Sequence, residues 1–149
     1  MRVILQRCSR AEVRIDGQPV GQIGRGFMIL VGVTDGDTTA DADILAKKTA
    51  QMRVFEDAEG KMNLALKDVG GAILSISQFT LYADCKKGNR PSFIHAARPE
   101  TAEPLYNYYN DVLRTQYGLR VETGRFGADM KVDFVNDGPV TIILDSSEL

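Results

Sequence analysis

Three polar side chains follow an apolar run in the segment Ser77-Gln78-Phe79-Thr80. Residues 72–76 before it are mostly apolar, so they predict a strand whose end brings two hydroxyl groups and an amide together. Hydroxyl groups placed in this way could attack a substrate or orient it. Composition alone leaves a second interpretation open, in which Ser77 and Thr80 only complete local hydrogen bonds at the end of a strand.

A second unusual segment is Asn136-Asp137-Gly138-Pro139-Val140-Thr141. Its proline stands where the next residue of a hairpin would donate an N–H to the ladder, and proline has none. An X–Pro bond becomes cis at a cost of only about 0.5–1 kcal/mol, so a fixed cis peptide could turn the Gly138 and Pro139 carbonyls toward one point. A proline on an edge strand, at a wide turn, is the alternative.

The counts of histidine and cysteine narrow the chemistry, because His95 is the only histidine and Cys8 and Cys85 are the only cysteines. A histidine-rich metal site, a four-cysteine zinc site and a disulfide scaffold are therefore unlikely on composition, and we expect no metal and no cofactor. His95 could still serve as a general base in an esterase whose nucleophile is Thr80 or Ser92. A lone histidine is more often a surface or packing residue.

Length and composition predict one globular domain that spans residues 1–149. Apolar residues make up 44% and charged residues 26% of the chain. The net charge is −2, which excludes a protein that coats nucleic acids with a basic surface on all sides. The most apolar run, Gly26 to Val33, is far shorter than the ~20 residues that span a membrane, and Met1 to Gln6 is too short for a signal peptide. We therefore expect a cytoplasmic protein.

Strands dominate the expected elements, and two amphipathic helices complete them. Asp16-Gly17 between alternating runs predicts a hairpin. Gly21, Gly24 and Gly26 join two predicted strands, so they do not form a dinucleotide-binding loop. The last two predicted strands flank residues 136–139 and should form a closing hairpin. The predicted strands are residues 3–5, 11–15, 20–23, 27–33, 72–79, 132–135 and 140–144, and the predicted helices are residues 39–53 and 99–116.

Taken together, these segments resemble the D-aminoacyl-tRNA deacylases, first known as D-tyrosyl-tRNA deacylases. The resemblance runs through Met1-Arg-Val-Ile-Leu-Gln-Arg-Cys8, Ser77-Gln-Phe-Thr-Leu-Tyr-Ala-Asp84, Lys87-Gly-Asn-Arg-Pro-Ser-Phe93 and Asn136-Asp-Gly-Pro-Val-Thr141. It implies an α/β fold, a strand-rich single domain with mixed, barrel-like sheets and two amphipathic helices. It also implies a homodimeric, metal-independent hydrolase that cuts the ester between a D-amino acid, or glycine, and the terminal ribose of tRNA, and that spares L-aminoacyl-tRNA.

The resemblance further implies roles for single residues. The Gly138-Pro139 peptide would be cis and would enter the partner subunit's site, where its carbonyl oxygens engage the substrate's α-ammonium and leave no room for an L side chain. Residues 77–80 would line the same pocket, and Phe79 would offer its backbone N–H to the developing oxyanion. Arg7 would brace the Gly-Pro segment.

Two points stay open within this interpretation. Thr80 has no obvious base beside it, so the 2′-hydroxyl of the substrate could assist hydrolysis instead. Lys86, Lys87 and Arg90 form the densest basic cluster and are the natural contacts for tRNA phosphates, with a solvated loop as the alternative. The expected partners are aminoacyl-tRNA and a second copy of the chain, with no membrane and no DNA. A non-catalytic dimeric RNA-binding module is the main competing function.

Overall fold

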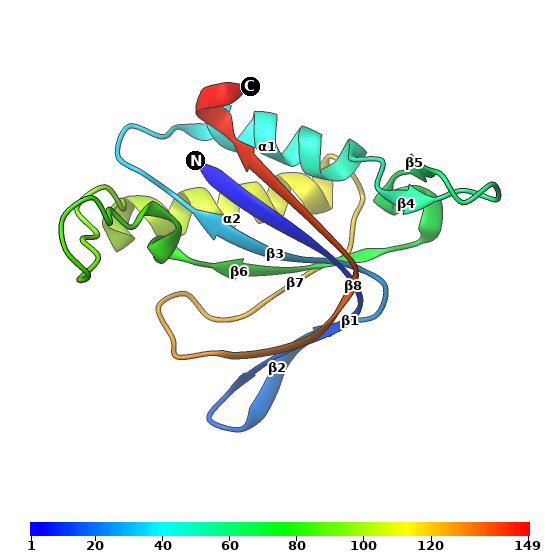
Figure 1. Cartoon of the computed structure of the whole chain (residues 1–149), viewed down its shortest axis with the longest axis horizontal. Coiled ribbons are helices and arrows are strands. Elements are labelled where there is room, and N and C mark those ends of the chain that lie inside the picture. Colours follow the sequence, from blue (N-terminus) through cyan, green and yellow to red (C-terminus); the bar gives the residue numbers. More distant parts are fainter.

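A mixed β-sheet and two helices on one side of it make up the computed structural model, which describes residues 1–149 (Figure 1). The strands are β1 (Arg2–Ile15), β2 (Gln18–Ile23), β3 (Gly26–Gly32), β4 (Phe55–Glu56), β5 (Met62–Leu64), β6 (Ala72–Ser77), β7 (Val121–Thr123) and β8 (Lys131–Asp145). The helices are α1 (Thr39–Gln51) and α2 (Pro99–Thr115), with short 3₁₀ helices η1 (Leu66–Val69), η2 (Phe79–Tyr82) and η3 (Ser146–Glu148).

The long strand β1 organises the main sheet. Its first half pairs with β3 and its second half with β2, while β8 runs antiparallel along its other edge. β3, β6 and β7 continue the sheet as parallel neighbours. β2 curls back toward β7, where the Arg120 guanidinium donates to the Gln22 carbonyl at 3.0 Å. The sheet is thus nearly a closed barrel, and the predicted fold class is confirmed.

Alternation along the strands separates two groups of buried side chains. Phe27 and Ile73 point to the helices and join a core of 25 buried residues, whereas the next residues, Met28 and Leu74, join a smaller core of eight inside the curled sheet. Successive side chains of a strand point to opposite faces, so a strand buried on both faces is apolar throughout. This explains the unbroken apolar run of β3 and the mostly apolar sequence of β6.

Several predicted elements are confirmed. The helices begin where expected, at Thr39 and at Pro99, which occupies the first turn of α2. Asp16 and Gly17 form the turn between β1 and β2, with φ values of 50° and 77°. Gly24 lies in the connection between strands β2 and β3, and no helix follows it as a dinucleotide-binding loop would require.

Other predictions need correction. The pieces predicted at 3–5 and 11–15 are one strand, β1, because bulges keep the intervening residues within the ladder. The strand predicted for 72–79 ends at Ser77, and Phe79 begins the 3₁₀ turn η2. Short strands β4, β5 and β7 were not predicted, since two or three residues carry no periodic signal.

The predicted closing hairpin is wrong, because β8 is a single strand of 15 residues. Both of its halves pair with β1, and the irregular segment lies between the pairs Gln6–Thr141 and Cys8–Asn136. There, Arg7 alone stands opposite residues 137–140, which we call the Gly-Pro bulge. Its Gly138-Pro139 peptide is cis. The sequence pattern of a turn therefore marks a bulge in a continuous strand.

No helix of the structure combines the length and the apolar character needed to cross a membrane.

Candidate active site

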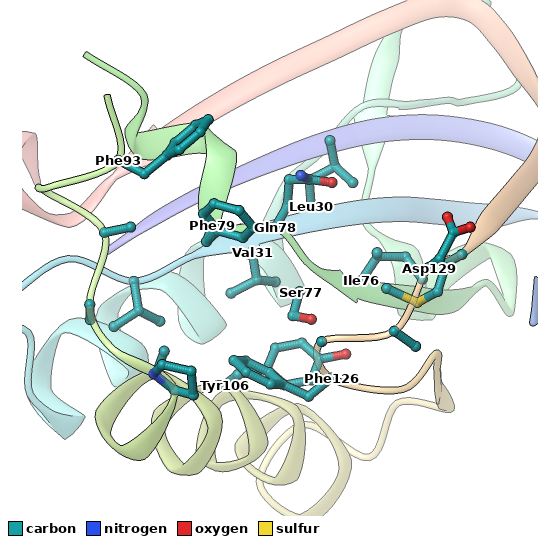
Figure 2. A pocket seen from close by; sticks show the side chains of 18 of the residues that line it. Leu30, Val31, Ile76, Ser77, Gln78, Phe79, Phe93, Tyr106, Phe126 and Asp129 are labelled. Atoms are coloured by element: carbon teal, nitrogen blue, oxygen red, sulfur yellow. The ribbon is translucent and has the colours of Figure 1, made fainter. Parts of the chain in front are cut away.

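A pocket of about 630 Å³ lies between the end of β6 and helix α2 (Figure 2). Fourteen of its 19 lining residues are hydrophobic, and Asp129 is the only charged residue among them. The Asp129 carboxylate pairs with the Lys131 ammonium at 2.9 Å. The volume lies in the range of sites for small molecules, which are mostly apolar with a few polar groups.

Three of the four residues predicted from the strand end line this pocket: Ser77, Gln78 and Phe79. Ser77 is the last residue of β6, and the Gln78 N–H donates to the Val31 carbonyl at 2.7 Å. Thr80 is exposed and does not line the pocket, but its hydroxyl accepts from the Gln78 amide at 2.5 Å. The amide therefore connects Thr80 to the pocket wall.

The 3₁₀ turn η2 leaves two backbone donors free, one of them on Phe79, which lines the pocket. Helical turns do not supply acceptors for their first N–H groups. The N–H groups of Phe79 and Thr80, the first two residues of η2, find no acceptor elsewhere in the chain. Free N–H groups at a pocket can stabilise negative charge on a substrate oxygen.

The opposite wall of the pocket contains residues that the sequence did not identify as site residues. Tyr106 of α2 lines the pocket, and its hydroxyl donates to the carbonyl of Ser75 on β6 at 2.6 Å. Burial raises the pKa of Tyr106, so the hydroxyl stays a neutral donor. The ring of Phe126, 6.2 Å from that of Tyr106, lies beside it (Figure 2). Tyr106 lies on a helix predicted from its amphipathic pattern, which gives no signal of a pocket, and only Gly124 and Gly127 indicate the loop that carries Phe126.

The predicted basic cluster lies on a loop next to the pocket. Backbone hydrogen bonds in both directions between Asp84 and Ser92 close the loop at 2.7 and 2.9 Å. The Lys86 N–H donates to the Asp84 carboxylate at 3.0 Å and lowers the pKa of that carboxyl. The loop carries three cationic side chains that are all exposed and form no ion pair: Lys86, Lys87 and Arg90.

His95 does not line the pocket. Its Nε2 lies 3.4 Å from the Asp84 carboxylate, and its side chain is exposed. No hydrogen bond connects it to Thr80 or to Ser92. The structure therefore brings together none of the nucleophile and base pairs of the esterase hypothesis.

Arg7 and the Gly-Pro bulge form a second group of predicted residues. The Arg7 guanidinium is buried, donates to the Val54 carbonyl at 2.6 Å and donates to the Asp137 carbonyl at 3.2 Å. The carboxylates of Glu56 and Asp137 each lie 3.6 Å from it. A Cβ added to Gly138, whose φ is +122°, would lie 3.2 Å from the same guanidinium.

Within one chain, the pocket and the Gly-Pro bulge are far apart. Ser77 pairs with Val31, which pairs with Val3 of β1. Arg7 lies four residues farther along β1, which corresponds to about 13 Å along the strand. Figure 1 likewise places η2 and the middle of β8 toward opposite ends of the sheet. The structure of the single chain does not bring the two groups together.

The structure contains no group of three or more His, Cys, Asp or Glu side chains that could hold a metal ion.

The comparisons with known proteins cover nearly the whole chain. Residues 4–145 match the model of a protein family described as D-Tyr-tRNA(Tyr) deacylase. The chain belongs to this family. D-aminoacyl-tRNA deacylases of Halalkalibacterium halodurans and Thermus aquaticus are 59% and 57% identical to it over 146 and 148 residues. These matches cover 98% and 99% of this chain, and 99% and 97% of the two relatives. The family resemblance of the sequence motifs is confirmed.

Solved structures share the fold of this chain. A protein described as a c-Myc DNA unwinding element binding protein superposes with a TM-score of 0.91 and is 40% identical. The superposition covers 97% of this chain and 98% of that protein's chain. A probable eukaryotic D-amino acid tRNA deacylase gives a TM-score of 0.82 at 20% identity, over 96% of this chain and 97% of its own, and shows the shared fold.

Proposed function

We propose that the chain hydrolyses the ester bond of D-aminoacyl-tRNA and releases free D-amino acid and tRNA. The names of the relatives support the substrate class. The single observation that carries the chemistry is the pair of free N–H groups of Phe79 and Thr80 beside an apolar pocket. The pocket has the volume for the aminoacyl end of a tRNA rather than for its body.

The reaction needs few protein groups. A water molecule, which the neighbouring 2′-hydroxyl of the ribose orients and helps to deprotonate, attacks the ester carbonyl, whose oxygen becomes negative and accepts from the Phe79 N–H. Collapse of the tetrahedral intermediate breaks the bond to the ribose oxygen, which takes up a proton. An amino acid ester is already activated, so we propose a metal-independent reaction in which His95 transfers no proton.

The edge of the sheet supports a dimer. β8 pairs only with β1, so its outer edge is open along a strand of 15 residues. Ile143 and Val135 on this strand are 65% and 44% exposed. A long, open, partly apolar edge strand is a surface that another chain can cover. We propose that a second copy of this chain covers it.

In such a dimer, the Gly-Pro bulge of one subunit would enter the pocket of the other. The carbonyl groups of Gly138 and Pro139 would accept from the substrate's α-ammonium, and Arg7 would hold the bulge from behind. An L side chain would point into the space that the bulge occupies, whereas a D side chain would point away. Glycine has no side chain to exclude, so glycyl-tRNA, including glycine mischarged on tRNA-Ala, would also be hydrolysed.

The loop of residues 86–90 would bind the tRNA backbone. Its exposed cations have no carboxylate partner, so they can neutralise phosphates without first breaking an ion pair. These cations give the surface beside the pocket a local positive charge that can attract tRNA, although the chain as a whole has a net charge of −2.

The experiment that tests this function compares D- and L-tyrosyl-tRNA with the pure protein, by release of labelled tyrosine. We expect rapid hydrolysis of the D-ester alone, before and after exhaustive chelation and equally with His95→Ala. Binding without turnover would support the RNA-binding module instead. Loss of activity in chelator with recovery on added zinc would contradict metal independence, and a loss of about 100-fold with His95→Ala would restore the esterase hypothesis.

The role of Thr80 needs its own pair of measurements. If Thr80 only orients the pocket wall, Thr80→Val and Thr80→Ser should retain measurable activity, and a D-tyrosyl-tRNA that ends in 2′-deoxyadenosine should be hydrolysed poorly. The opposite pattern, or a covalent aminoacyl ester trapped on Thr80, would identify Thr80 as the nucleophile.

A further inference from the structure

Two exposed aromatic side chains meet at one side of the pocket, and an exposed isoleucine follows one of them in the chain. Phe79, Phe93 and Ile94 are 56%, 38% and 73% exposed. The rings of Phe79 and Phe93 meet edge to face, with their centroids 5.0 Å apart and their planes at 75° (Figure 2). Clustered exposed apolar side chains mark interaction sites more often than single ones do. We call these three residues the aromatic rim.

The aromatic rim is continuous with both the pocket and the basic loop. Phe79 and Phe93 also line the pocket, so their exposed parts form its border. Phe93 directly follows Ser92, where the backbone pairing with Asp84 closes the loop that carries Lys86, Lys87 and Arg90. Aromatic rings beside cations that have no carboxylate partner are typical of surfaces that bind single-stranded nucleic acid.

We propose that the aromatic rim stacks the base of the unpaired nucleotide that precedes the terminal adenosine of the tRNA, while the basic loop contacts its phosphates. This inference rests on the proposed function, which places the aminoacyl end in the adjoining pocket. A strand that leaves the pocket on this side meets the rim first and the cations next.

Charge favours RNA over a second protein chain as the occupant. The nearby Asp84 carboxylate accepts from the Lys86 N–H and lies 3.4 Å from His95, and it forms no ion pair with the loop's side-chain ammonium or guanidinium groups. A protein that covered the rim would have to approach these three unpaired cations, whereas a nucleic acid brings its own phosphates. The edge-to-face contact also restrains the Phe93 ring, which lowers the entropy that stacking costs.

The test is a double-mutant cycle between the protein and its substrate. It compares kcat/KM for intact D-tyrosyl-tRNA with kcat/KM for D-tyrosyl-tRNA whose nucleotide before the terminal adenosine is abasic. With the unchanged protein, we expect the abasic substrate to react about 5- to 150-fold more slowly, the equivalent of ~1–3 kcal/mol of stacking. With Phe93→Leu, which retains apolar volume but has no ring, the two substrates should differ by less than about twofold.

Two further variants isolate the ring. Phe93→Tyr retains the ring and should retain the difference between the two substrates. Tyr108→Leu is the matched control, because Tyr108 is an exposed aromatic residue of α2 whose hydroxyl bonds to Asp43, outside the pocket. It should leave the difference unchanged.

Equal abasic effects in the unchanged protein and in Phe93→Leu would overturn the proposal. Dissociation of a dimer by Phe93→Leu, measured by sedimentation, would also overturn it, because a second copy would then be the occupant. Failure of the proposed function is distinguishable, since the unchanged protein would then not hydrolyse intact D-tyrosyl-tRNA at all.

Discussion

The pocket at the end of β6 is concave and mostly apolar, whereas the Gly-Pro bulge of β8 is exposed and is held by one buried arginine. The pocket offers backbone N–H donors, and its one charged lining residue, Asp129, is paired with Lys131. The bulge offers carbonyl groups and does not line this pocket. An aminoacyl ester needs N–H donors for its carbonyl oxygen and acceptors for its α-ammonium. The pocket offers the donors and the bulge offers the acceptors.

The two regions are also held in place in different ways, one by main-chain hydrogen bonds and the other by a side chain. The donors at Phe79 and Thr80 are positioned by main-chain hydrogen bonds of β6 and η2, which side-chain substitutions leave in place. The Gly-Pro bulge depends on the side chain of Arg7, which contacts Val54 and Asp137 at once. Substitutions should therefore act on the two regions in different ways.

The largest effect should come from removal of a pocket donor. Phe79→Pro deletes the N–H, and proline is tolerated at the first position of a helical turn; the preceding Gln78 is already extended, with φ −147° and ψ 89°. We expect kcat for D-tyrosyl-tRNA to fall by about 100- to 1000-fold. The matched variant Phe79→Leu retains the N–H, and its kcat should stay within about tenfold of the original. Equal losses in both variants would show that the ring, not the N–H, matters.

The next largest effect should come from the bulge itself. A Cβ on Gly138 would lie 3.0 Å from the Val140 nitrogen and 3.2 Å from the Arg7 guanidinium, so Gly138→Ala must displace one of them. Because a displacement of about 1 Å at a site costs about 100-fold, we expect kcat/KM to fall by about that factor. Gly60→Ala is the control, because Gly60 also has a positive φ, +77°, but no atom within 4 Å. Both variants should lose stability on thermal unfolding, Gly138→Ala the more, and only Gly138→Ala should lose activity.

A smaller effect is expected from the support of the bulge. Arg7→Lys keeps the charge but loses the fork of donors that reaches Val54 and Asp137. We expect kcat/KM to fall about tenfold and the free energy of unfolding to fall by ~1–3 kcal/mol, because the buried Val54 carbonyl loses its donor. Arg10→Lys on the same strand has only an exposed pair with Asp133 and should change neither quantity measurably. Unchanged kcat/KM with Arg7→Lys would mean that the bulge needs no brace.

The smallest effect concerns binding at the pocket side. Replacing Lys86 and Lys87 with Gln should reduce the slope of log Kd for tRNA against log salt by about 1.4, at about 0.7 per phosphate contact. The control replaces Lys47 and Lys48, exposed on α1, in the same way. If both pairs change the slope equally, or if neither does, the loop is a solvated surface.

The sequence predicted the two regions unequally. Residues 77–80 were identified because a buried strand followed by polar residues is a local pattern, although the strand ended two residues early. Residues 136–139 have the composition of a turn, and their true state depends on pairing with β1 about 130 positions away, which no local pattern contains. Likewise, the amphipathic pattern of the helix predicted for residues 99–116 does not reveal that the Tyr106 ring faces a pocket and that its hydroxyl contacts β6.

Mixed dimers test most directly whether one site needs both regions from different chains. Phe79→Pro chains retain an intact bulge, and Gly138→Ala chains retain an intact pocket. We expect each variant alone to be nearly inactive, and heterodimers purified with two different tags to regain about half of the original activity per dimer, from one restored site. Heterodimers that are proven to form but remain inactive would contradict the account and would place each complete site within a single chain.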